Sequence, residues 1–162
     1  MRIQELLGMP VVAVDRGVRL GTVKGVELDP NLGRIRYLRI NADDRRPDGV
    51  IPWETLRSIG RDAVTVESPS ALQETIPGAD CDRMISHFGD RPVVTESGSR
   101  IGTITSYELD PTTGVITNYH VALSGLLNRL TRRDVEFPQA AIRSVGVDAV
   151  IVSDAVLPAA AA

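Results

Sequence analysis

One stretch of this sequence occurs twice in recognisable form, and that repeat limits what the chain can fold into more than any other feature. Gly17–Ile35 and Gly98–Ile116 lie 81 positions apart and share ten of nineteen residues. Ile51–Val66 and Phe137–Val152 lie 86 positions apart and share eight of sixteen. Self-similarity of this kind is the signature of a duplicated structural unit. The sequence therefore predicts two units of one fold, each of roughly 75 to 80 residues.

The pattern inside each unit is that of short strands joined by tight turns. Apolar residues in Arg19–Leu28 and Arg34–Ile40 recur with an approximate period of two, as expected of strands. Between these segments lies Asp29–Gly33, and Asp110–Gly114 repeats it in register. Its Asp accepts hydrogen bonds from the backbone ahead, its Pro presets φ, and its Gly takes a positive φ, so a hairpin turn is predicted.

Later segments of each unit predict a short helical turn and a final strand. The turns are expected at Trp53–Ser58 and Gln139–Ser144, after a proline that ends the preceding strand. The final strands are expected at Ala63–Val66 and Ala149–Val152, and a brief helical turn at Ser70–Thr75. We therefore predict an all-β chain with a first barrel at 1–68, a joint at 69–85, a second barrel at 86–157 and a tail at 158–162.

Three motifs in fixed order carry a resemblance to a known family. They are Gly-x-x-Leu-Gly-x-Val at Gly17–Val23, Asp-Pro-x-x-Gly-x-Ile at Asp29–Ile35, and the Ile-Pro segment at Ile51–Val64. A second copy with conservative exchanges occupies Gly98–Ile104, Asp110–Ile116 and Phe137–Val150. Both copies resemble the PRC-barrel domain. The resemblance implies two tandem small β-barrels, packed on one another, over nearly the whole chain.

The same resemblance implies docking on a larger assembly rather than chemistry. The domain is similar to the cytoplasmic domain of the photosynthetic reaction-centre H subunit and to the C-terminal domain of a ribosome maturation factor. It therefore favours a non-enzymatic adaptor or scaffold that docks on a protein assembly. Two alternatives remain open: an RNA-processing or ribosome-assembly factor, and a regulator of a photosynthetic or electron-transfer complex.

Composition narrows the environment and the class of partner. A net charge of −3 and a pI of about 5.4 argue against direct binding of nucleic acid. Cys81 is the single cysteine, so an internal disulfide and a cysteine-rich metal site are excluded. The N-terminus lacks the pattern of a signal peptide, and no apolar stretch is long enough to span a membrane. We expect a cytoplasmic protein.

Residues capable of chemistry are present, but their spacing does not indicate a catalytic site. Glu27 with Asp29, and Glu108 with Asp110, are carboxylate pairs of the kind a glycosidase uses, although the turns already account for the aspartates. The histidines, His87 and His120, and the thiol of Cys81 have no spacing typical of a metal site or a nucleophile pair. No catalytic residue, cofactor or metal is expected.

The loop of the second unit is the most distinctive candidate for contact with a partner. It is five residues longer than its counterpart, and on a short helix its leucines would share a face flanked by arginines. A lid over the barrel explains the leucines as well as docking on a protein does, and peripheral membrane contact is not expected. An exposed Trp53 could also anchor a partner, or it could close the end of its barrel. Exposed sheet edges could support a homodimer. The candidate docking residues are Leu126, Leu127, Arg129, Leu130, Arg132, Arg133 and Trp53.

Overall fold

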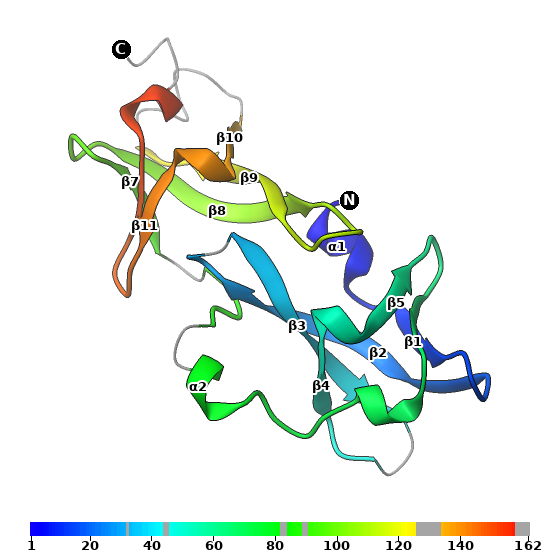
Figure 1. Ribbon diagram of the computed structural model, residues 1–162. Coiled ribbons are helices and arrows are strands. Elements are labelled where there is room, and N and C mark those ends of the chain that lie inside the picture. The colour runs from blue at the N-terminus through cyan, green and yellow to red at the C-terminus, as the bar shows by residue number, and fades with distance from the viewer. Residues whose placement is uncertain (32, 44–45, 82–83, 89–90, 126–133, 158–162) are drawn as a thin grey trace. The chain divides into compact units, whose positions relative to one another are not determined.

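The computed structural model describes the chain except for residues 32, 44–45, 82–83, 89–90, 126–133 and 158–162. Its contacts divide the chain into two compact units (Figure 1). The first comprises Met1–His87 and Leu109–Val115, and the second comprises Phe88–Glu108 and Ile116–Ala162. The segment 69–85, predicted as a joint, falls within the first unit.

The first unit is a small β-barrel of short strands in the order β4-β3-β2-β1-β6-β5 among the residues that are described. β1 and β6 pair in parallel. Its elements are α1 (Ile3–Leu6), β1 (Pro10–Ala13), β2 (Val18–Asp29), β3 (Arg34–Ala42), β4 (Gly49–Pro52), η1 (Trp53–Thr55), β5 (Leu56–Ile59), β6 (Val64–Val66), η2 (Pro69–Ala71) and α2 (Gly78–Cys81).

The second unit repeats this topology strand for strand, in the order β10-β9-β8-β7-β12-β11. β7 and β12 pair in parallel, at the place of β1 and β6. The prediction of an all-β chain of two tandem barrels is confirmed. Its elements are β7 (Pro92–Thr95), β8 (Arg100–Leu109), β9 (Ile116–Leu123), β10 (Val135–Pro138), η3 (Gln139–Ala141), β11 (Ile142–Val145), β12 (Val150–Val152) and η4 (Asp154–Val156).

The repeated turn forms as its residue types require. Asp29 Oδ1 accepts a hydrogen bond of 3.0 Å from the backbone N–H of Asn31. In the second copy Asp110 Oδ1 accepts one of 2.8 Å from the N–H of Thr112. Gly33, at the end of the first turn, has a φ of 59°. The aspartate and glycine therefore fix the geometry of the hairpin, and the turn prediction is confirmed.

The second glycine of the Gly-x-x-Leu-Gly motif allows two strands to approach closely. A Cβ on Gly21 would lie 2.2 Å from the carbonyl oxygen of Asn41, and one on Gly102 would lie 1.9 Å from that of Ala122. No side chain fits at those distances, so glycine is required at both positions.

The predicted helical turns are shorter than the sequence suggested. Each ends after one 3-10 turn, at Thr55 and at Ala141. The following residues, Leu56–Ile59 and Ile142–Val145, form β5 and β11, which pair with β6 and β12. Pairing with a strand later in the chain therefore overrides a weak local preference for helix. The helix α1 was not predicted, and η2 replaces the turn expected at Ser70–Thr75.

The core of the second unit is aromatic. The ring of Tyr119 packs edge-on against Phe88 and stacks on Phe137, with centroids 5.5 Å apart in both pairs. Tyr107 meets Phe88 edge-on at 6.2 Å. Burial raises the pKa of Tyr119, because the phenolate cannot be hydrated there.

The segment that follows η2 is hydrogen-bonded to the first barrel at two points. Gln73 exchanges two backbone hydrogen bonds with Val50 of β4, both of 2.8 Å. Ile85 exchanges two with Leu28 of β2, of 2.8 and 2.9 Å. Figure 1 shows this segment running from the end of β6 past β4 toward α2. We call residues 69–87 the strap, and it covers the outer edge of β4.

Candidate interaction site

The structure describes only one of the predicted docking residues. Trp53, the first residue of η1, is 6% exposed and belongs to the core of the first unit. A side chain so deeply buried presents little surface to a partner. The other candidates lie outside the described residues; they are Leu126, Leu127, Arg129, Leu130, Arg132 and Arg133.

The carboxylates of the first unit have structural partners. Glu27 is 2% exposed and accepts hydrogen bonds from the Nε of Arg39 and from the Oγ of Ser86, the latter at 2.7 Å. Asp29 is 7% exposed, and its side chain closes the hairpin turn described above. A glycosidase needs two carboxylates that face a sugar across a cleft. These two instead hold strands and the strap in place.

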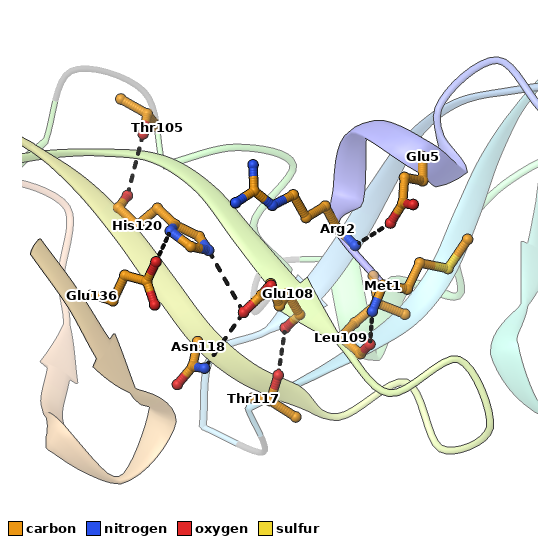
Figure 2. A network of polar contacts seen from close by, with 10 residues as sticks. All are labelled: Met1, Arg2, Glu5, Thr105, Glu108, Leu109, Thr117, Asn118, His120 and Glu136. Atoms are coloured by element: carbon orange, nitrogen blue, oxygen red, sulfur yellow. Dashed lines mark hydrogen bonds and ion pairs between the residues drawn. The ribbon is translucent and has the colours of Figure 1, made fainter. Parts of the chain in front are cut away.

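In the second unit a histidine occupies the position of Arg39. His120 lies on β9 between two carboxylates from neighbouring strands, as Figure 2 shows. Its Nδ1 is 3.1 Å from Oε1 of Glu136, and its Nε2 is 3.6 Å from Oε2 of Glu108. Glu108 also accepts a hydrogen bond of 3.4 Å from the amide of Asn118. The permanent ion pair of the first unit is thus replaced by a titratable one.

The surroundings of His120 satisfy only one of its two ring nitrogens. The residue is 9% exposed, and its buried Nε2 has no hydrogen-bond partner, because 3.6 Å exceeds hydrogen-bond length. A neutral imidazole has one N–H and one lone pair, whereas an imidazolium has two donors for two carboxylates. Among the described residues, no three His, Cys, Asp or Glu side chains are grouped to hold a metal ion. The cluster is therefore an electrostatic feature of the β9–β10 pair.

Glu136 belongs to an edge strand, and edge strands leave backbone donors and acceptors free for pairing. In the described part of the chain, the sheet orders place β4, β5, β10 and β11 at edges. β4 is covered by the strap. β5 and β11 are short, each contains a bulge, and each carries an arginine in an ion pair: Arg57 with Glu67 at 2.9 Å, and Arg143 with Glu96 at 3.2 Å. Bulges and charges of this kind protect an edge against pairing.

β10 has none of these protections. It pairs with β9 without a register shift, and it pairs with no other strand among the residues that are described. Glu136 lies opposite His120 as Val50 lies opposite Arg39 in the first unit. Both backbone groups of Val50 bond outward, to Gln73. The same register directs the N–H and C=O of Glu136 away from β9.

Two residue exchanges explain why the second unit does not repeat the strap. A Cβ on Gly49 would lie 2.2 Å from the carbonyl oxygen of Gln73, and the second unit has Val135 in place of Gly49. The 3-10 turns η2 and η4 begin after Ser68 and Ser153, which aligns Gln73 with Pro158. Proline has no N–H to donate. Both exchanges are visible in the sequence, but only the register of the structure shows what they do.

Comparison with protein families identifies the repeated unit. The sequence matches the PRC-barrel domain twice, over residues 1–73 and over residues 84–155. The chain belongs to the PRC-barrel family. Comparison with curated proteins found no match. Two PRC barrels in tandem indicate a small protein-interaction module. No helix in the described part of the chain is long and apolar enough to cross a membrane.

Proposed function

We propose that this protein is a non-enzymatic adaptor that docks on a larger protein assembly through the β10 edge of its second PRC barrel. One observation carries the proposal: the strap covers the edge of β4 in the first barrel, whereas the equivalent edge of β10 has no strand beside it in the described residues. The duplicated unit has changed in the residues that sealed its edge.

The contrast between edges supports a docking role because natural proteins rarely leave a regular edge unprotected. An exposed, unbulged edge is a template for pairing with another chain, and it is normally blunted, covered or used. The other edges of both sheets are covered or blunted, as described above. β10 is regular, and Phe137 at its centre is buried in the aromatic core, which holds the strand rigidly.

Affinity purification of the tagged full-length protein from its own cells, followed by mass spectrometry, tests the proposal. Glu136→Pro removes the outward N–H of β10 without removing a donor to β9. Val147→Lys is the matched control, since Val147 is 87% exposed in the turn between β11 and β12 of the same barrel. We expect a partner that the wild type and the control retain and that the Glu136→Pro variant loses.

The identity of that partner separates the remaining functional classes. Ribosomal proteins would indicate an assembly factor, and components of an electron-transfer complex would indicate a regulator. A partner set unchanged by Glu136→Pro, in a variant whose urea unfolding midpoint matches the wild type, would contradict docking at β10. Charge reversal of the arginines in the adjoining loop provides a separate variant. Loss of partners only there would place docking on that loop; its residues are Arg129, Arg132 and Arg133.

A further inference from the structure

We infer that the partner docks as an extended strand on β10 and carries a lysine or arginine directly opposite Glu136. This inference rests on the adaptor function proposed above and specifies the chemistry of the partner. It follows from the backbone geometry of the edge, from the charges along it, and from the poor fit of the alternative occupants.

The backbone of β10 is prepared to accept a strand. Glu136 lies opposite His120 at a position where neither residue bonds the other through its backbone, which brings their side chains close. The outward N–H and C=O of Glu136 are therefore a donor and an acceptor available to one residue of a neighbouring strand. Val135 causes no conflict there, because every residue of a regularly paired strand carries a Cβ. The conflict at Gly49 arises only with the crossing path of the strap.

The charges along the edge favour a basic partner. The side chain of Glu136 is 57% exposed, and one of its oxygens lies 3.1 Å from His120. A carboxylate has about four acceptor positions, so the group can bind a second cation on its open side. Asp134, two residues earlier on the same face, is also exposed. A strand with a cation opposite Glu136 would complete a row across three strands: His120, Glu136 and the added lysine or arginine.

The other face of β10 favours apolar residues between those cations. Val135 is partly exposed, and Phe137 is buried in the aromatic core. Because successive side chains of a strand point to opposite faces, an added strand would place alternate residues beside the acidic face and beside Val135. The partner segment therefore alternates basic and apolar residues.

A second copy of the chain fits this edge poorly. Antiparallel pairing of β10 with itself would place Glu136 opposite Glu136, opposite Asp134 or opposite Pro138. The first two arrangements bring like charges face to face, which destabilises a sheet. The third loses a hydrogen bond, because proline has no N–H.

The inference is tested by amide hydrogen exchange and NMR titration of the full-length protein. The probe is a short synthetic peptide of alternating lysine and valine, and the control peptide has glutamate in place of lysine. In the free protein we expect the Glu136 amide to exchange quickly and the Val50 amide, bonded to Gln73, to be protected. The lysine peptide should slow exchange at Glu136 and leave Val50 unchanged.

A charge-reversed variant tests the residue opposite Glu136. Glu136→Lys should weaken binding of the lysine peptide roughly tenfold and should favour the glutamate peptide, because a cross-strand attraction becomes a repulsion. Added salt should weaken binding of the lysine peptide to the wild type. Val147→Lys, which adds the same charge elsewhere on the barrel, should bind both peptides as the wild type does.

Protection of the Glu136 amide in the free protein would overturn the inference. Protection that is independent of protein concentration would show that the chain covers its own edge, and protection that rises with concentration would show self-association. Absence of binding by the lysine peptide, or equal binding of both peptides, would also overturn it. If a cellular partner were nevertheless lost with Glu136→Pro, the adaptor function would stand and the basic strand would be wrong. If no partner depended on Glu136→Pro, the proposed function itself would fail.

Discussion

Val50 and Gln73 exchange two backbone hydrogen bonds of 2.8 Å, so the strap pairs with the outer edge of β4 at this point. The contact depends on Gly49, because a Cβ there would lie 2.2 Å from the carbonyl oxygen of Gln73. The second barrel has Val135 in its place. One glycine therefore separates a barrel that covers its own edge from one that does not.

Gly49→Val should release the strap from β4. The loss of two backbone hydrogen bonds should lower the free energy of unfolding by about 2 kcal/mol, and the Val50 amide should lose protection from exchange. Urea unfolding and amide exchange measure the two effects. Gly78→Ala, at a glycine with open space around its Cβ position, is the control and should leave the Val50 amide protected.

Glu27→Gln should destabilise the first barrel more than Glu108→Gln destabilises the second. Glu27 is 2% exposed and bonds to Arg39 and Ser86, whereas the side chain of Glu108 is 30% exposed. Removing the charge from a hydrogen-bonded buried carboxylate should cost about 1.5–3 kcal/mol. Urea unfolding of both variants gives the comparison. Equal losses would show that burial of Glu27 contributes nothing beyond its charge.

Asp154 should make the second barrel more stable at neutral pH than at low pH. Hydrogen bonds from the Oγ of Ser97, at 2.6 Å, and from its backbone N–H, at 3.2 Å, lower the pKa of Asp154 below its ordinary value of 3.8. A lowered folded-state pKa gives stability that is present above the unfolded pKa and lost as pH falls through the folded one.

The variant Asp154→Ala checks this dependence through its melting temperature. It should melt below the wild type at pH 7, and the difference should shrink as the pH falls below 3.8. Ser97→Ala in the Asp154→Ala background should add little, because the two residues act as one pair. A difference in melting temperature that stays constant with pH would argue against the role of the carboxylate.

Phe137→Ala should lower the free energy of unfolding by about 3–5 kcal/mol, since it opens a cavity in the aromatic core. Phe137 is 2% exposed, and its ring stacks on Tyr119. Near-UV circular dichroism during urea unfolding follows the loss of this packing. Phe137→Leu keeps most of the volume and should cost less than half as much. A small effect of the alanine variant would mean that the core repacks around the vacancy.

The sequence alone predicted the duplication, the all-β class and the hairpin turns. These features depend on local chemistry: Asp29 and Gly33 form their turn whatever the rest of the chain does, and the alternation of apolar residues marks strands. The family resemblance was equally accessible, because its motifs include residues such as Gly21 whose small size is required by the fold. The end of the helical turn at Thr55 was not, because β5 forms through pairing with β6.

Only the tertiary structure decided what the differences between the two copies mean. Gly49 against Val135 reads as an ordinary exchange until the register places Gln73 beside Gly49. His120 looked like an isolated histidine because Glu136 lies sixteen residues away in the sequence and opposite it on β10. Strand pairing joins residues that are distant in the chain, so local pattern determined which elements form, and register alone determined which edge was left open.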